Sequence, residues 1–203
     1  MENQQDVWDA IAPEWHEFKT KQGEHTLEFL KNKTGKILDF GSGSGRYLLK
    51  MPKAKLYLVD FSENMIELAK QKAKQGNIDA EFAVASMTKT LYENNFFDYA
   101  IASSSFHCLN KTEQKKATKE LFRILKPGAE AEISVWNINS KRFKNAPKEK
   151  LIRWRDKGAR YYYLFDEKEI HALFEKAGFK IIQKQESNVM IVFTVQKSKI
   201  HTN

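Results

Sequence analysis

The chain has 203 residues, 41% of them hydrophobic and 30% charged, and a net charge of +8, which suits one folded, soluble domain rather than a disordered chain. No apolar run approaches the roughly 18 residues of a membrane helix, and the polar start lacks the pattern of a secretory signal, so we expect a cytoplasmic protein without a membrane segment. The single Cys108 excludes an internal disulfide, and five scattered histidines offer no zinc-ligand spacing.

The N-terminal segment shows helical periodicity in its aromatic residues. Trp8, Trp15 and Phe18 fall on one face of a predicted helix over 7–18. An aromatic stripe of this kind either docks its helix on the core or forms a lid over a site. Residues 1–35 are therefore interpreted as an N-terminal helical lid, with simple docking on the core as the alternative.

From residue 36 onward, β-rich runs alternate with helical periodicity, which predicts βαβ units. The predicted strands cover 35–40, 54–60, 80–85, 96–104 and 130–136, and a closing hairpin covers 179–185 and 189–197. The predicted helices run from a Ser62 cap to Gly76, from a Thr112 cap to a Pro127-Gly128 stop, and over 166–178 from an Asp166 cap. This order favours an α/β fold, namely a single-domain, doubly wound, mostly parallel seven-stranded sheet with an antiparallel C-terminal hairpin.

A glycine-rich turn follows the first predicted strand. Asp39 ends an apolar run, and Gly41, Gly43 and Gly45 occupy a turn that we expect to open the first helix and to let backbone approach a ligand closely. The spacing G-x-G-x-G departs from the dinucleotide fingerprint, from the nucleophile elbow and from the P-loop. These departures count against NAD, a serine hydrolase and a nucleoside triphosphate.

A second acidic residue, Asp60, ends the second predicted strand, 21 residues after Asp39. A carboxylate at this position can accept both ribose hydroxyls of an adenosine, as it does in other nucleoside-cofactor folds. A glycine turn or a strand-end carboxylate is a weak signal by itself. Their order and spacing together predict a nucleoside-binding site.

These residues resemble the class I S-adenosylmethionine-dependent methyltransferases. "LDFGSGSG" is similar to the first motif of that superfamily, "LVDFSENMIELAK" to its second, "NNFFDYAIASSSFHCL" to its fourth and "LFRILKPGAEAEISVW" to its post-catalytic strand. The resemblance implies a Rossmann-like fold, S-adenosyl-L-methionine as cofactor and residues 36–136 as the cofactor-binding half. The implied cofactor-binding residues are Asp39, Gly41, Gly43, Gly45, Asp60, Phe61, Met65, Ser86, Met87 and Ser103, with Ser104 beside Ser103 on the reaction face.

One position departs from the superfamily pattern. Many members carry Gly-Asp after the third strand, with the Asp on the adenine amine, whereas this chain has Ala85-Ser86-Met87. The resemblance therefore implies that Ser86 or the backbone recognises adenine.

A closer resemblance is to the tRNA wobble-uridine carboxymethyl methyltransferases, which esterify 5-carboxymethyluridine. The markers are His107-Cys108 after the fourth strand, Trp136 at the end of the fifth, Arg153-Trp154, and "RYYYLF" at 160–165. Three of them are imperfect, since Cys108, Arg153 and Tyr163 stand where that family has His, Pro and His.

This closer resemblance implies a substrate, a partner and substrate-facing residues. Arg160 would hold the acceptor carboxylate, Tyr161 and Tyr162 would bond to or stack on an extruded base, and His107 would lie on the substrate face. The substrate would be tRNA. A small zinc-ribbon activator protein would cover an apolar region near the fourth and fifth strands.

The chemistry of a carboxylate acceptor is consistent with this resemblance. A carboxylic acid has a pKa near 4, so the acceptor is already ionised at neutral pH and needs no general base. A guanidinium such as that of Arg160 matches a carboxylate bidentately and keeps its charge. What remains for the protein is to align the acceptor oxygen with the methyl group.

Residues 141–160 carry nine Lys or Arg and two acidic residues, whereas residues 1–30 carry seven acidic residues and two lysines. A clustered basic segment with aromatics is typical of RNA-binding surfaces, although a solvated loop fits the same pattern. We interpret 137–165 as a basic, aromatic substrate insertion and 166–197 as a closing helix and hairpin.

Two alternatives to the tRNA methyltransferase remain open. A small-molecule O- or N-methyltransferase would use the same cofactor half, and the basic segment would then be irrelevant. A non-catalytic RNA- or cofactor-binding scaffold is the third interpretation, favoured only by Ser86 in place of Asp. For "RYYY" itself, a strand with tyrosines packed on the sheet and Arg160 on the surface is the structural alternative.

Overall fold

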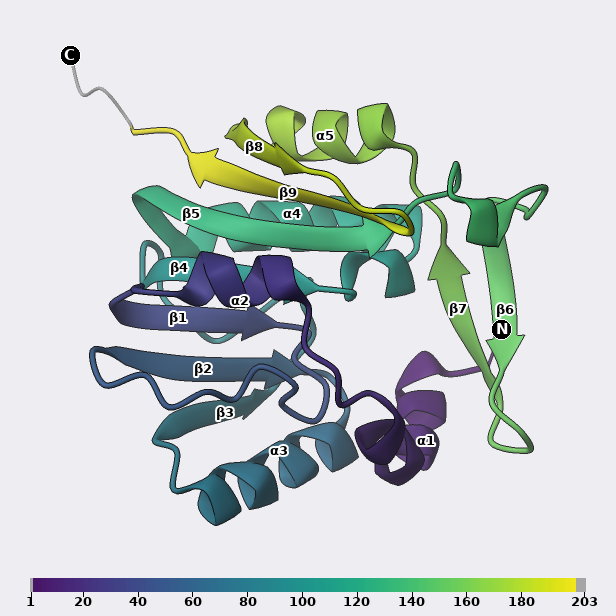
Figure 1. Ribbon diagram of the computed structural model, residues 1–203, viewed down its shortest axis with the longest axis horizontal. Helices are drawn as coiled ribbons and strands as arrows, with labels where there is room; N and C mark the ends of the chain where they lie inside the picture. Colours follow the sequence, from purple (N-terminus) through teal and green to yellow (C-terminus); the bar gives the residue numbers. More distant parts are fainter. Residues whose placement is uncertain (1, 200–203) are drawn as a thin grey trace.

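A seven-stranded sheet in the order β3-β2-β1-β4-β5-β9-β8 is the middle layer of the computed structural model, which describes residues 2–199 (Figure 1). The first five strands in this order run parallel, and β9 pairs antiparallel with both β5 and β8. The predicted fold is confirmed. The strands are β1 (Gly35–Phe40), β2 (Ala54–Asp60), β3 (Ala80–Val84), β4 (Phe97–Ser103), β5 (Leu125–Trp136), β8 (Phe179–Gln185) and β9 (Met190–Lys197).

Helices cover both faces of the sheet (Figure 1). On one face, α2 (Glu24–Leu30) and α3 (Glu63–Gly76) enclose an apolar cluster with Ile37 and Leu58. On the other, α4 (Lys111–Ile124) and α5 (Glu167–Lys176) pack on a larger cluster around Ile133 and Phe193. Helix α1 (Gln4–Phe18) lies beyond the carboxyl ends of the parallel strands. The N-terminal helix therefore lies next to the carboxyl ends of the parallel strands.

The helix caps follow local side-chain chemistry. Ser62 and Asp166 cap α3 and α5 as predicted, each accepting a hydrogen bond from a backbone N–H of the first turn. For α4 the predicted cap is wrong, because Asn110 rather than Thr112 precedes the helix. The Asn110 side chain accepts from the backbone of Thr112 and Glu113, and the Glu113 side chain bonds back to Asn110 in a capping box.

The end of α4 also differs from the prediction. The helix ends at Ile124 and β5 begins at the next residue, since Leu125 already pairs with Phe97 of β4. Pro127 and Gly128, predicted to stop the helix, lie inside β5. Tertiary pairing with β4 therefore lengthens the strand across two residues that normally break regular structure.

Residues 41–53 contain no helix, so the helix expected after the glycine turn is absent. The chain passes through consecutive turns and then straight into β2. This segment is too short for a helix with a connecting loop at each end. Tyr47 and Leu48 pack against α2 and α3 in its place.

The sequence analysis missed a two-stranded sheet within the basic segment. Strands β6 (Glu149–Arg153) and β7 (Ala159–Tyr163) pair antiparallel and stand beside α1 (Figure 1). Two single-turn 3₁₀ helices, η1 (Phe106–Cys108) and η2 (Lys141–Phe143), complete the elements. The segment "RYYY" is thus a strand that pairs with β6. Its tyrosines are buried, Tyr161 and Tyr163 in the core cluster of the main sheet and Tyr162 against Trp136 of β5, whereas the alternative of a surface Arg160 is wrong, because only 5% of that residue is exposed.

Strands β4 and β5 lie in the middle of the sheet, each paired on both sides. Their edges are therefore closed to a partner that adds a strand, and the expected activator surface near these two strands stays a prediction. The open edges of the described sheet are β3 and β8. Within residues 2–199, no helix is long and apolar enough to span a bilayer, and no cluster of three His, Cys, Asp or Glu side chains could hold a metal ion.

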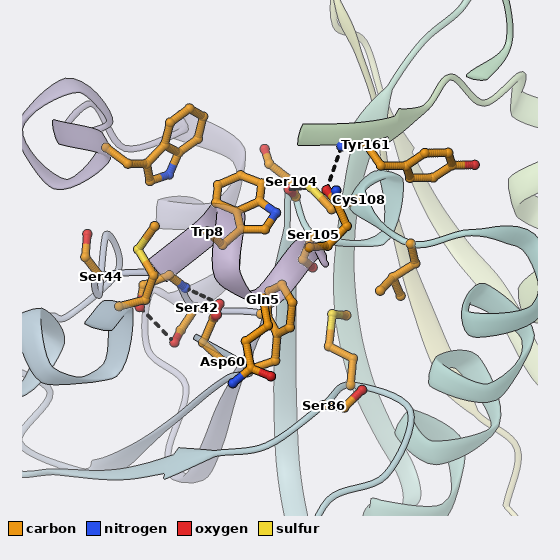
Figure 2. A pocket seen from close by; sticks show the side chains of 18 of the residues that line it. Gln5, Trp8, Ser42, Ser44, Asp60, Ser86, Ser104, Ser105, Cys108 and Tyr161 are labelled. Carbon is orange, nitrogen blue, oxygen red and sulfur yellow. Dashed lines mark hydrogen bonds between the residues drawn. The ribbon is translucent and has the colours of Figure 1, made fainter. Parts of the chain in front are cut away.

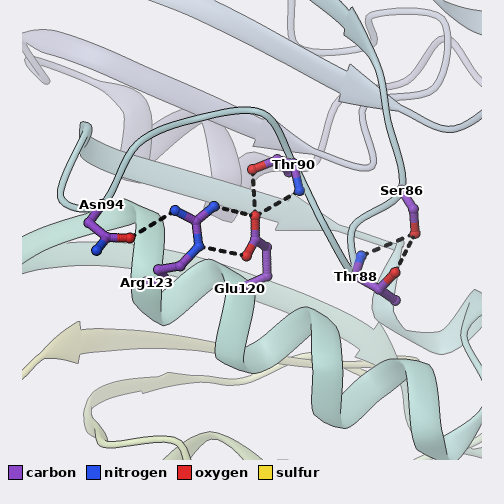
Figure 3. Close-up of polar contacts among 6 residues, drawn as sticks. All are labelled: Ser86, Thr88, Thr90, Asn94, Glu120 and Arg123. Carbon is purple, nitrogen blue, oxygen red and sulfur yellow. Dashed lines mark hydrogen bonds and ion pairs between the residues drawn. The ribbon is translucent and has the colours of Figure 1, made fainter.

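One buried carboxylate fixes the loop between β3 and β4. Glu120 on α4 accepts two hydrogen bonds from Thr90, through its backbone N–H (2.7 Å) and its hydroxyl (2.6 Å) (Figure 3). Arg123 donates to both oxygens of Glu120 and, through its other nitrogen, to Asn94 (2.9 Å). Burial opposes ionisation of Glu120, but the hydrogen bonds from Arg123 and Thr90 hold its pKa below the usual value. The loop is thus tied to α4 at two points.

We expect Glu120→Gln to lower the free energy of unfolding by about 2 kcal/mol, because the amide keeps the Thr90 contact but turns an N–H group toward the Arg123 donors. Urea unfolding at neutral pH measures this. Glu93→Gln removes an exposed carboxylate of the same loop and is the matched control. Equal urea midpoints for Glu120→Gln and Glu93→Gln would contradict the role given to Glu120.

Candidate functional site

A cavity of about 390 Å³ lies at the carboxyl ends of β1, β2 and β4, a size and position typical of ligand sites in open α/β sheets. Figure 2 shows Ser42, Ser44 and Asp60 on one side of it, and Ser104, Ser105 and Cys108 on the other. Trp8 projects from α1 between these two sides. The cavity therefore has polar residues on two sides and an aromatic side chain between them.

The glycine turn lies against the opposite wall at van der Waals distance. Gly41 has φ +79°, and a Cβ there would lie 2.5 Å from Ser105 Cβ and 3.0 Å from Met87 Sδ. Any side chain at Gly41 would therefore clash and strain the backbone. The backbone N–H groups of Gly41 and Ser42 both donate to the Val59 carbonyl, which fixes the turn on β2.

Asp60 joins the glycine turn to the start of α3. One carboxylate oxygen accepts from the Gly43 N–H (2.8 Å) and the other from the Ser62 N–H (3.0 Å). Burial raises the pKa of Asp60 to about 6, against the opposing effect of these N–H groups. Each oxygen keeps acceptor capacity, so the carboxylate fits the two hydroxyls of a ribose.

The residues after β3 border the far end of the cavity. Ser86 and Met87 line it, but the Ser86 hydroxyl already accepts from the Thr88 N–H (3.1 Å) and shares a hydrogen bond with the Thr88 hydroxyl (2.9 Å), as Figure 3 shows. The Glu120 contacts hold the next residues of this loop. When the Ser86 hydroxyl donates its proton to Thr88, its oxygen keeps one acceptor position for an adenine amine.

The predicted site residues divide into two groups. The cavity is lined by Gly41, Gly43, Asp60, Phe61, Met65, Ser86, Met87, Ser103, Ser104 and Tyr161. The residues that do not line it are Asp39, Gly45, His107, Arg160 and Tyr162. Asp39 is buried on β1, and burial raises its pKa to about 7, with Arg46 opposing the shift.

The predicted substrate-face residues His107 and Tyr162 lie in an aromatic stack. Their ring centroids lie 4.8 Å and 4.4 Å from that of Trp136 and 5.5 Å from each other. His107 Nδ1 accepts from the Trp136 backbone N–H (3.2 Å), and burial, with nearby Lys19 and Arg46, lowers its pKa to about 3. His107 is therefore neutral at physiological pH and cannot act as an acid there.

Arg160 is enclosed by aromatic rings. Its guanidinium carbon lies 4.8 Å from the Trp154 centroid, 4.9 Å from Trp15 and 5.8 Å from Trp8, and one nitrogen donates to the Tyr162 hydroxyl (2.6 Å). Only 5% of the residue is exposed. Cation–π contacts thus replace a carboxylate partner.

Tyr161 borders the cavity through its backbone side. Its N–H donates to the Gln4 side chain (2.7 Å), and Figure 2 shows its ring directed away from Trp8 and Asp60. Base stacking by this ring would therefore require a rearrangement.

Sequence reasoning missed several lining residues. Arg46, which directly follows the last glycine, and Lys19 at the end of α1 both line the cavity, as do Gln4 and Gln5 of the first helical turn. The position of Arg46 beside the glycine motif was the one available signal. Nothing local marks Gln4 or Gln5, because they reach the cavity only through the packing of α1.

The basic segment is partly neutralised in the fold. Lys148 pairs with Asp166 and Glu169, and Arg155 and Lys157 pair with Glu14 of α1. Within the described residues, the cations of the segment that remain outside ion pairs and outside the core are Lys141, Arg142, Lys144, Lys150 and Arg153.

Comparison with known proteins points to one reaction class. Residues 37–128 match a family model described as a methyltransferase domain. The demethylmenaquinone methyltransferase of Leptospira interrogans is 30% identical over 173 residues, 72% of this chain and 68% of that protein. The tRNA (carboxymethyluridine(34)-5-O)-methyltransferase of Arabidopsis thaliana is 32% identical over 133 residues, 64% of this chain but 31% of the plant protein.

A solved structure shares the fold over nearly the whole chain. It is the methyltransferase of a complex with the Trm112 methyltransferase activator from Haloferax volcanii, with a TM-score of 0.75, 16% identity and coverage of 98% of each chain. At this identity the likeness shows the fold alone.

We expect Asp60→Asn to weaken binding of S-adenosylhomocysteine roughly 10- to 100-fold, because the amide loses one acceptor oxygen and opposes a backbone N–H. In the unsubstituted protein, affinity should fall as pH drops below about 6, since binding to the ionised carboxylate must then displace a proton. Calorimetric titration between about pH 5 and pH 8 tests both expectations. A pH-independent affinity would show that Asp60 does not bind the ligand as a carboxylate.

Proposed function

Because the chain belongs to the S-adenosylmethionine-dependent methyltransferases, we propose that it transfers the methyl group to the carboxylate of 5-carboxymethyluridine at the wobble position of tRNA. The observation that carries the proposal is a cavity lined by two cations, Lys19 and Arg46, in which no side chain of residues 2–199 is positioned as a general base. Such a site suits an acceptor that is already an anion.

The cavity fits the cofactor half of this reaction. Asp60 presents two acceptor oxygens to a ribose, Gly41 and Gly43 place no side chain in the cavity, and Phe61 and Met65 line the same region. Bound S-adenosyl-L-methionine supplies a sulfonium methyl group, so an acceptor oxygen gains the O–CH₃ bond as the S–CH₃ electron pair returns to sulfur, and no proton moves.

The titratable groups around the cavity argue against proton abstraction. Burial raises the pKa of Cys108 to about 12, and His107 is neutral and outside the cavity. Glu113 lines the cavity, but its carboxylate accepts from the Asn110 N–H (2.9 Å) in the cap of α4. Asp60 already receives two backbone N–H groups. A carboxylate acceptor needs none of these groups as a base.

The RNA part of the proposal has separate support. The unpaired cations of the basic segment lie on the η2 and β6 side of the structure, and phosphate contacts would use them. Arg142 also lies over the Trp136 ring, 5.0 Å from its centroid. The plant relative acts on carboxymethyluridine in tRNA, and we carry that substrate class to this chain as part of the proposal.

The predicted substrate residues enter the proposal in modified form. In the present arrangement Arg160 reaches the cavity only if Trp8 and Trp15 of α1 move, so its proposed contact with substrate requires the lid to open. Until then, Arg160 and Tyr162 position α1 and β7 relative to each other.

We propose a small zinc-ribbon activator protein as the partner. The Haloferax neighbour was solved in complex with the Trm112 methyltransferase activator, and this fold matches that methyltransferase over 98% of the chain. A partner that extends the sheet would use the edge of β3 or β8, since the strands between them are paired on both sides.

A second candidate is methylation of a quinone-type small molecule. The Leptospira relative covers a larger share of both sequences than the plant relative does, and Trp8, Trp15 and Phe61 give the cavity an aromatic lining. This candidate predicts activity that is independent of RNA.

The deciding experiment incubates the chain, with and without a Trm112-type activator, with S-adenosylmethionine and tRNA bearing 5-carboxymethyluridine. Nucleoside mass spectrometry should find the methyl ester, because the acceptor is ionised at neutral pH. tRNA with 5-carbamoylmethyluridine, which lacks the anion, is the matched control and should stay unmethylated.

Absence of the ester with and without the activator would refute the proposed substrate. A parallel reaction with demethylmenaquinol tests the second candidate. Full activity of the isolated, monomeric chain would refute an obligate activator.

A further inference from the structure

Arg46 lines the cavity, and it is the one arginine among residues 2–199 that does so. One of its nitrogens donates to the Ser103 hydroxyl (2.9 Å) and carbonyl (3.3 Å), at the carboxyl end of β4. Ser103 is held in turn by the Tyr47 hydroxyl (3.1 Å) and by Ser134 (3.2 Å). The guanidinium is therefore fixed at one end, beside the residues predicted to form the reaction face.

Lys19 lines the same cavity from the other side. Its backbone N–H closes α1 on the Trp15 carbonyl (2.8 Å), which places the side chain at the mouth of the cavity. Burial, followed by the charges of Arg46 and Arg142, lowers the pKa of its ammonium group. Lys19 therefore lies close enough to both arginines to be repelled by them.

No acidic side chain among residues 2–199 forms an ion pair with Arg46 or Lys19. Arg46 favours the ionised form of Asp39, but burial still raises the pKa of that carboxyl to about 7, so it is partly protonated at neutral pH. Partly buried like charges without a counterion raise the free energy of the site. A bound anion would relieve that cost.

We propose that Arg46, assisted by Lys19, forms a carboxylate-binding subsite at the reaction end of the cavity. The guanidinium has nitrogens to spare after its bonds to Ser103, and its fork matches a carboxylate, while the lysine adds a second charge. The subsite rests in part on the proposed function, because the carboxylate belongs either to the acceptor or to the methionine part of the cofactor. Arg160, enclosed by tryptophans, cannot take this role in the present arrangement.

The test measures binding of two ligand pairs, in each of which one member carries a carboxylate and the other does not, to Arg46→Met, Arg46→Lys and a control, Lys50→Met, which removes an exposed cation four residues away. The first pair is S-adenosylhomocysteine and 5′-methylthioadenosine, which lacks the amino acid. The second is the nucleosides 5-carboxymethyluridine and 5-carbamoylmethyluridine, added to protein saturated with S-adenosylhomocysteine. Dissociation constants are measured by calorimetry.

Arg46→Met should lose roughly tenfold or more of its affinity for the carboxylate member of one pair and retain affinity for the other member, with Arg46→Lys intermediate. A loss of affinity for S-adenosylhomocysteine but not for 5′-methylthioadenosine assigns the subsite to the cofactor. A loss of affinity for 5-carboxymethyluridine but not for 5-carbamoylmethyluridine assigns it to the acceptor. Equal affinities of Arg46→Met and the unsubstituted protein for all four ligands would overturn the subsite. Equal weakening of both members of each pair would also overturn it, because the effect would then not depend on the carboxylate.

Failure of the proposed function is distinguishable from failure of the subsite. If the unsubstituted protein makes no ester on carboxymethyluridine tRNA, the proposed acceptor is wrong. The comparison of S-adenosylhomocysteine with 5′-methylthioadenosine still tests Arg46, because it requires only the cofactor half.

Discussion

The carboxylate of Asp60 is the contact on which the site depends. It accepts backbone N–H groups from Gly43 and Ser62, so a single side chain holds the glycine turn, the end of β2 and the start of α3 together. Ser62 in turn caps α3 and donates to Asp9 (2.6 Å), which brings α1 to the same point. Ionisation of a buried carboxylate is costly, and these N–H groups offset part of that cost.

A second constraint acts across the cavity through α1. Glu14 accepts from the Trp154 indole (2.6 Å) and pairs with Lys157 (2.8 Å), which ties the helix to the hairpin that carries β7. Trp8 and Trp15 thereby cover Arg160 on one side and border the cavity on the other. The same packing that buries one arginine leaves Arg46 facing the cavity.

Local patterns predicted most of the fold. The alternation of apolar strands and capped helices was sufficient for β1, β2, α3 and the closing hairpin, because each is specified by contiguous residues. The prediction failed where pairing overrode local propensity, as when β5 extended through Pro127 and Gly128. It failed again at the short crossover after Gly45, where the segment is too short for the expected helix, and at β6, whose pairing with β7 has no local signal.

For the site, local sequence patterns were enough to predict the cofactor half. A glycine turn after one strand and a carboxylate at the end of the next must meet at the carboxyl edge of a parallel sheet, because β1 and β2 are paired neighbours. Which cations face the cavity depends on tertiary packing. Arg160 and Arg46 are equally basic in the sequence, but tryptophans from α1, more than 140 residues away from β7 along the chain, pack over Arg160 and leave Arg46 at the cavity wall. Side-chain burial depends on such long-range packing, which no local spacing encodes.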